Sequence, residues 1–146
     1  MRIVKLSKEV FGFDTKDGCI AYFKHVLPWQ KERFNIMGEG HHIAPDGLKS
    51  NEIVVFSYDG NIVCIARTDH IKVEPNKKRV VAIILKEGTR RVFNDPPSLQ
   101  SLEDVLLAQG MTSKLVKSQG WNIIDVNLEK AVIQFLAKHD WKQYDL

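Results

Sequence analysis

The stretch Asn51–Arg67 constrains the fold more than any other part of this 146-residue chain. Two apolar runs, Ile53–Phe56 and Ile62–Ala66, stand on either side of the dipeptide Asp59-Gly60. Asp-Gly between apolar runs is typical of a tight β-hairpin, because the favoured two-residue turns need positive φ. Each run is nearly continuous rather than alternating, which is typical of strands buried on both faces. The stretch therefore predicts an antiparallel hairpin at the centre of a closed or covered sheet.

Other apolar runs predict strands on both sides of this hairpin, and residues at helical spacing predict three helices. The helices begin at the capping residues Thr15, Ser98 and Asn127. The first is expected to end before Pro28, because a residue that precedes proline is disfavoured in the α region, and the second at Gly110. The further expected strands are Arg2–Leu6, Phe34–Met37, Val80–Leu85 and Val92-Phe93, with Ile71–Val73 extending the second hairpin strand. Trp121–Ile124 is expected to form a short strand or a turn. The expected apolar helix faces are Ile20, Phe23 and Leu27; Leu99, Leu102, Val105 and Leu106; and Leu128, Ala131, Val132 and Phe135.

Length and composition narrow the class of protein. A chain of this length fits one mixed α/β (α+β) domain, residues 1–146, with a substantial core. No apolar run approaches the roughly 20 residues of a membrane span, and the first residues lack the apolar core of a signal peptide, so we expect a cytoplasmic protein. Cys19 and Cys64 are expected to be buried thiols rather than a disulfide.

His41 and His42 are the most conspicuous candidates for chemistry, in the Gly-rich segment 38–47. They could ligate a metal or contact a phosphate or a base, but no Cys-x-x-Cys or His-x-x-x-His partner stands at ligand spacing, so neither a metal nor a cofactor is expected. The chain also lacks a Gly-x-Ser-x-Gly elbow and a phosphate-binding loop ending in Lys-Ser or Lys-Thr. We therefore assign no catalytic residue, and a solvated loop or a ligand-contacting loop both remain open.

Basic residues gather in the predicted turns and connectors. Lys and Arg that contact phosphates position a nucleic acid without reading its sequence. The net charge of +3 permits such a partner without requiring it, since clustering matters more than the sum. An ordinary solvated surface remains the alternative. The candidate backbone contacts are Lys31, Arg33, Lys77, Lys78, Arg79, Arg90 and Arg91.

Two patterns resemble a known superfamily. The segment Met37–Ala66 resembles the core of PUA-like domains, which include the EVE, ASCH and YTH groups. The segment contains a Gly-rich loop, then a Pro-Asp-Gly-Leu-Lys stretch, then two strands joined by a Tyr-Asp-Gly turn. The opening Val-x-Leu-x-Lys-Glu-x-x-Gly-Phe is similar to reader domains fused to HNH-type restriction endonucleases. The likeness covers roughly residues 1–95, and this chain has no nuclease module. The residues of the opening pattern are Val4, Leu6, Lys8, Glu9, Gly12 and Phe13, followed by Cys19, Ile20, Phe23 and Leu27.

The resemblance implies a small curved mixed β-barrel with flanking helices and a pocket that accepts an extruded, often modified, base. The leading expectation is a non-catalytic module that reads a modified base in DNA, as the specificity domain of a restriction or defence system, with a nuclease domain or subunit as partner. An RNA-binding PUA-like protein is one alternative. A small ASCH-type hydrolase is another, and would need Lys24, Glu39 and Tyr58 to converge.

The expected base pocket lies in the segment 29–42. Trp29 supplies an aromatic wall, while Gly38 and Gly40 let the backbone approach a ligand closely. His41 and His42 supply hydrogen bonds near neutral pH. Ser57 and Tyr58, at the end of the first hairpin strand, are expected to complete the pocket. An exposed Trp29 is the prediction, and a core Trp29 would contradict it.

Overall fold

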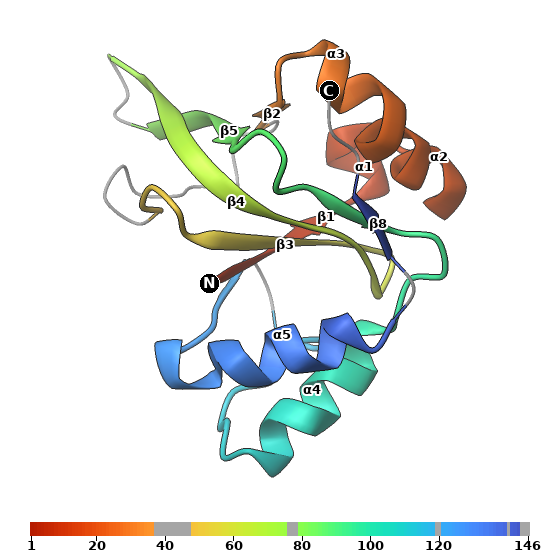
Figure 1. Ribbon diagram of the computed structural model, residues 1–146, viewed down its shortest axis with the longest axis vertical. Helices are drawn as coiled ribbons and strands as arrows, with labels where there is room; N and C mark the ends of the chain where they lie inside the picture. Colours follow the sequence, from red (N-terminus) through yellow and green to blue (C-terminus); the bar gives the residue numbers. More distant parts are fainter. Residues whose placement is uncertain (37–47, 76–78, 119–120, 140, 144–146) are drawn as a thin grey trace.

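A computed structural model describes residues 1–36, 48–75, 79–118, 121–139 and 141–143 (Figure 1). The strands are β1 (Arg2–Leu6), β2 (Arg33–Asn35), β3 (Ile53–Tyr58), β4 (Asn61–Glu74), β5 (Arg79–Leu85), β6 (Arg91–Phe93), β7 (Asn122–Ile123) and β8 (Trp141–Gln143). The helices are α1 (Lys8–Phe11), α2 (Lys16–Ala21), the π-helical η1 (Tyr22–Val26), α3 (Leu27–Trp29), α4 (Leu99–Ala108), the 3-10 turn η2 (Val126–Leu128) and α5 (Glu129–Ala137).

The predicted central hairpin is confirmed. Strands β3 and β4 pair antiparallel, and the turn residues Asp59 and Gly60 have φ of 48° and 73°. Two successive positive φ values define the turn that favours Asp-Gly. All six residues of β3 are buried, as the continuous apolar run predicts.

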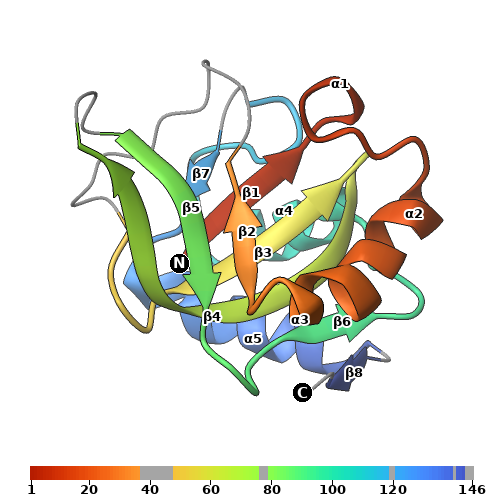
Figure 2. The same cartoon turned by 90° about the horizontal axis from the view of Figure 1, so that it is seen from above.

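Strand β4 links the two halves of the sheet. Its first half pairs with β3 and its second half with β5, and it curves strongly between them (Figure 2). The order along the sheet is β2-β5-β4-β3-β1-β7, with β6 beside β4 and β8 beside β6. Strand β1 runs parallel to β3, and the other pairs are antiparallel. The result is a mixed α+β fold around one curved sheet.

The strand pairing shows that the predicted closed barrel is wrong. Strands β2 and β7 stand at the two ends of the strand order, and within the described residues they do not pair with each other. Both strands are short, and side chains of the N-terminal helices pack against β2. Phe23 and Leu27, for example, pack in one cluster with Val4 and Phe34.

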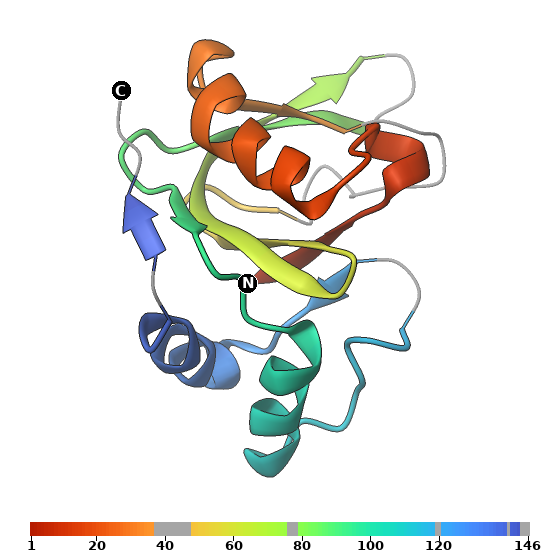
Figure 3. The same ribbon diagram turned by 90° about the vertical axis from the view of Figure 1, so that its right-hand side faces the viewer.

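Two apolar cores lie on the two faces of this sheet (Figure 3). Val54 and Phe56 belong to the core beneath the N-terminal helices, while Ile53 and Val55 belong to the core beneath α4 and α5. Successive strand residues point to opposite faces, so a strand between two cores needs apolar residues at every position. This arrangement explains the unbroken apolar runs.

The first helical segment departs from its predicted end. Thr15 caps it as expected, accepting a hydrogen bond of 3.0 Å from the Gly18 N–H. The helix nevertheless continues past Pro28, because η1 widens the preceding turn: the Leu27 N–H bonds to the Tyr22 carbonyl, five residues back. A widened turn avoids the spacing in which a proline ring clashes with a regular α-helix.

The C-terminal helices are confirmed with different details. Ser98 caps α4, but Val105 is 36% exposed and lies outside the buried face of Leu99, Leu102 and Leu106. Asn127 does not cap α5, because it lies within the 3-10 turn η2 that precedes the helix. Strand β8 and helix α1 were not expected.

Cys19 and Cys64 are free and buried, as predicted. Within the described residues, no helix is long and apolar enough to cross a membrane.

Candidate functional site

A small aromatic cavity of about 150 Å³ opens where the chain between α1 and α2 meets β2 and the end of α3. Gly12, with φ of 74°, turns the chain after α1, so that residues on both sides of it reach the cavity. The π-helical η1 begins with another lining residue, and β2 contributes two more. The cavity is lined by Phe11, Phe13, Tyr22, Gln30, Phe34 and Asn35.

The aromatic walls support one another. The rings of Phe11 and Phe34 are stacked at 5.5 Å between centroids, and those of Phe13 and Tyr22 are tilted at 5.1 Å. Phe34 continues into the core, 4.9 Å from the ring of Phe56. Contacts of this kind hold flat apolar walls in place before a ligand arrives.

Polar groups stand at the rim of this aromatic cavity. The Tyr22 hydroxyl donates to Gln30 Oε1 at 3.3 Å, and Arg33 Nε donates to Asn35 Oδ1 at 2.8 Å. Both bonds engage a carboxamide oxygen, which leaves the NH₂ groups as donors for a ligand. Burial raises the pKa of Tyr22 to about 12, with Cys19 and Glu32 adding to the shift. The Tyr22 hydroxyl therefore stays protonated at neutral pH.

The residues predicted for the pocket are only partly brought together. Trp29 is 88% exposed and does not line the cavity, although its neighbour Gln30 does. Ser57 and Tyr58 are buried rather than exposed to a ligand. The Tyr58 hydroxyl donates to the Phe13 carbonyl at 2.7 Å, so Tyr58 supports the cavity from behind. His41 and His42 lie outside the described residues, as do Gly38, Glu39 and Gly40.

The predicted basic residues have different surroundings. Lys31 and Arg33 are exposed beside the aromatic cavity, whereas Lys77 and Lys78 fall outside the described residues. Arg79 forms an ion pair of 2.9 Å with Glu74. Lys24, considered for the hydrolase alternative, donates to Asn94 at 2.9 Å.

The prediction that Arg90 contacts a nucleic-acid backbone at the surface is wrong. Its side chain is fully buried, and its guanidinium forms a two-point ion pair with Glu32, at 2.9 and 3.1 Å. A guanidinium in this position does not reach a phosphate outside the protein. Arg91, the next residue, lines a second cavity instead.

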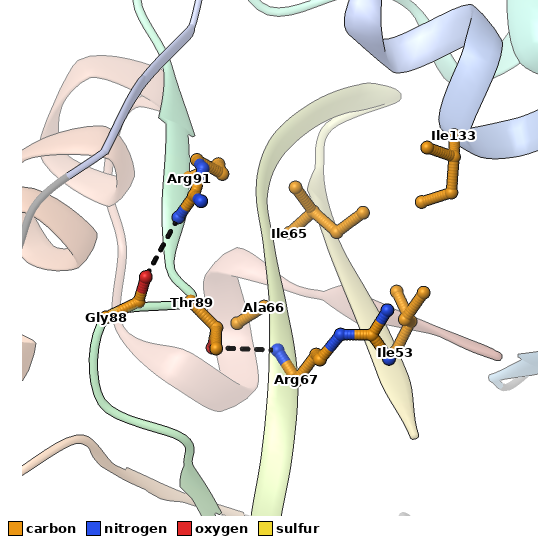
Figure 4. Close-up of a pocket in the computed structure, with 8 residues that line it drawn as sticks. All are labelled: Ile53, Ile65, Ala66, Arg67, Gly88, Thr89, Arg91 and Ile133. Atoms are coloured by element: carbon orange, nitrogen blue, oxygen red, sulfur yellow. Dashed lines mark hydrogen bonds between the residues drawn. The ribbon is translucent and has the colours of Figure 1, made fainter. Parts of the chain in front are cut away.

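That second cavity has a volume of about 250 Å³ and lies against α5 (Figure 4), on the side of the hairpin opposite the aromatic cavity. Its lining combines apolar residues with two arginines, which lie on opposite sides of Ala66 (Figure 4). The lining residues are Ile53, Ile65, Ala66, Arg67, Gly88, Thr89, Arg91 and Ile133. A third hollow, of about 440 Å³, contains Glu52 and Glu129, whose carboxylates pair with the Met1 amine at 3.3 and 3.7 Å. Within the described residues, no group of three or more His, Cys, Asp or Glu is placed to hold a metal.

Sequence reasoning missed most of the aromatic lining. The signal that could have found it is the concentration of Phe and Tyr between residues 11 and 34, on either side of Gly12 and in η1. The pattern predicts a link at Phe11 and Phe13 and a strand that begins at Phe34. It does not predict that these side chains converge, because convergence depends on packing between elements that are far apart in the chain.

The fold of this chain is similar to that of one solved structure, whose name contains the term ASCH. The chain is similar to a crystal structure of a mutant of ZmASCH from Zymomonas mobilis, with a TM-score of 0.52 and 8% sequence identity. The superposition covers 91% of this chain and 96% of that chain. At this identity the likeness concerns the fold alone. No protein-family model matches the chain, and no curated protein matches its sequence.

Proposed function

We propose that this protein is a PUA-like nucleic-acid-binding module that accepts an unstacked base in the aromatic cavity. The observation that carries the proposal is the cavity itself, with four aromatic walls and two carboxamides at its rim. Stacking on aromatic side chains contributes about 1–3 kcal/mol per base. That gain offsets the few kcal/mol needed to take a base out of its stack.

The dimensions and chemistry of the cavity fit one flat ring system. Its volume of about 150 Å³ lies below the roughly 300–1,000 Å³ of most small-molecule sites. A whole nucleotide would therefore remain mostly outside, with the base alone inserted. The NH₂ donors of Gln30 and Asn35 pair with acceptors on the base edge, and the Phe walls favour an added methyl group.

The exposed basic residues beside the cavity would hold the backbone. Lys31 and Arg33 flank Glu32 at the start of β2, where phosphate contacts would position the strand without reading sequence. Lys77, Lys78 and Arg79 are proposed to extend this contact. We further propose that the module reads DNA, within the cytoplasm, as the specificity domain of a restriction or defence system that supplies the nuclease. RNA is the competing ligand.

The direct test measures binding of matched oligonucleotides by fluorescence anisotropy at one salt concentration. Duplex DNA with a single N6-methyladenine or 5-methylcytosine is compared with plain DNA and with RNA of the same sequence. Tyr22→Ala should weaken binding of the preferred ligand about 5- to 150-fold, equivalent to 1–3 kcal/mol of stacking. Tyr22→Phe, which keeps the ring, is the matched control and should lose much less.

The outcomes separate the possibilities. Preference for RNA would reassign the ligand, and release of a changed nucleoside would indicate a hydrolase. Equal binding by wild type and Tyr22→Ala, with both proteins folded, would remove the cavity from the mechanism.

Trp29 is proposed to stack on a base next to the inserted one. Its ring is 88% exposed, whereas tryptophan is highly buried on average, so the ring is free to meet a base. Trp29→Ala should weaken binding while leaving the free energy of unfolding nearly unchanged.

A further inference from the structure

The lining of the second cavity combines apolar side chains with two arginines. Ile65 from β4 and Ile53 from β3 form an apolar floor, and Ile133 projects toward it from α5 (Figure 4). Arg67 and Arg91 line the same cavity. The site is separate from the aromatic cavity, with which it shares no lining residue.

Hydrogen bonds orient the two arginines, and no carboxylate among the described residues forms an ion pair with either of them. Arg67 Nη1 donates to the Asn51 carbonyl at 3.0 Å, and Arg91 Nη1 donates to the carbonyls of Gly88 and Arg90 at 3.1 and 3.4 Å. None of the ion pairs found among the described residues involves either side chain. The bonds named use only Nη1, so each guanidinium keeps the Nε and Nη2 edge that binds carboxylate or phosphate at two points.

None of the described residues that line the cavity carries a carboxylate. The Thr89 hydroxyl is engaged, since Oγ1 accepts from the Arg67 N–H at 3.1 Å and donates to the Lys86 carbonyl at 2.6 Å. Thr89 thereby fastens the turn after β5 to β4 and holds one wall of the cavity. Arg90 is neutralised by Glu32, so it adds little net charge. Arg67 and Arg91 therefore give the lining of this cavity a positive charge.

We propose that this cavity binds a small amphipathic anion, with a compact apolar body against Ile65 and Ile133 and a carboxylate or phosphate paired with the arginines. A wholly apolar ligand would desolvate guanidinium groups without a partner, which is unfavourable. A bare hydrated anion would gain nothing from the isoleucines. The volume of about 250 Å³ is below the usual range of roughly 300–1,000 Å³, which limits the body to about one ring.

The proposal is tested by NMR of isoleucine methyl groups during titration of the full chain. The probes are benzoate and phenyl phosphate, with benzyl alcohol as the uncharged control and inorganic phosphate as the anion without an apolar body. Benzoate, phenyl phosphate or both should shift the methyl signals of Ile53, Ile65 and Ile133, and the tighter of the two identifies the anionic group. Arg67→Gln, Arg91→Gln or both should weaken that binding about tenfold.

Lys72→Gln is the matched control, since it removes one exposed charge from β4 without touching the cavity. It should leave binding unchanged.

The proposal is overturned if benzyl alcohol or inorganic phosphate produces the same shifts, or if neither arginine variant weakens binding. It is also overturned if an oligonucleotide displaces the bound probe, because this face would then contact the nucleic-acid backbone. Each of these results leaves the aromatic cavity untested, so failure here is distinct from failure of the proposed function.

Discussion

Arg90 is the largest side chain that the structure buries completely. Its partner Glu32 has φ of 60°, in a region that L-residues rarely adopt, and lies at the turn just before β2. The ion pair ties the start of β2 to the start of β6, two strands that do not pair with each other. It therefore joins parts of the curved sheet that backbone hydrogen bonds leave apart.

Arg90→Met should lower the free energy of unfolding by about 3–5 kcal/mol, because it leaves the Glu32 carboxylate buried without its partner. The double variant Arg90→Met/Glu32→Gln should recover part of the loss, since the uncompensated charge is gone. Urea unfolding of both variants measures the difference. A single variant as stable as wild type would mean that the pair contributes nothing to the fold.

Arg90 also marks the limit of prediction at the residue scale. In the sequence it is one of two adjacent arginines in a polar turn, which is typical of a surface. Its carboxylate partner stands 58 positions away in the chain, and only the folded sheet brings them together. The same holds for Phe11 and Phe34, whose stacking depends on how α1 packs against β2.

The carboxylate of Glu103 holds the segment after α4 in place through hydrogen bonds. Glu103 of α4 accepts hydrogen bonds from the N–H groups of Leu115 and Val116, at 2.5 and 3.1 Å. Lys5 of β1 donates to the Leu115 carbonyl and to Ser118 of the same segment. Burial alone would raise the pKa of the Glu103 carboxyl, but the hydrogen bonds from Val116, Leu115 and Gln100 and the charge of Lys114 lower it overall.

The pKa of Glu103 is lower in the fold than its ordinary value of 4.5. The Glu103 carboxylate therefore stabilises the fold at pH values above 4.5, and this stabilisation is lost as the pH falls below 4.5. Glu103→Gln keeps an acceptor but no charge, and should cost about 1–2 kcal/mol at pH 7. The difference from wild type should shrink as the pH falls below that value. Thermal unfolding at several pH values measures it, with the neighbouring Asp104→Asn as control. A difference that is the same at every pH would contradict the assignment.

The central hairpin was predictable because its information is local. Both its turn and its strands follow from residues within a 17-residue stretch, Asn51–Arg67. The end of the first helix was not, because the widened turn η1 that accommodates Pro28 leaves no clear mark in the sequence. The short elements β8 and α1 were also missed, since three or four residues carry too little pattern.

Gly60→Val should destabilise the protein by more than about 1 kcal/mol, because a β-branched residue is strained at φ of 73°. An added Cβ meets no atom within 4 Å, so the cost is one of backbone conformation and not of space. Gly60→Asn is the control and should cost less, since Asn tolerates positive φ. Equal stability of the Val and Asn variants in urea unfolding would show that the turn is unstrained.

Because one sheet is shared by two cores, the whole molecule should unfold as a unit. Val54 and Val55 are neighbours in β3 but pack on opposite faces. Val54→Ala and Val55→Ala should each lower the stability by about 1.6 kcal/mol or more, from about 0.8 kcal/mol per buried CH₂. Each should shift one single transition, which calorimetry can test. Two separate transitions, each moved by only one variant, would contradict this coupling.

The parallel pairing of β1 with β3 has a consequence for the newly made chain. Arg2 lies opposite Val54 and Leu6 opposite Tyr58, so the pairing of β1 with β3 cannot be completed until residue 58 has been added. At about 5–20 residues per second, this takes about 3–10 s. During that interval the apolar side chains of Ile3, Val4 and Leu6 remain available to chaperones and to other unfolded chains. The β3–β4 hairpin, whose strands follow one another directly, forms on arrival and offers β1 its first permanent edge.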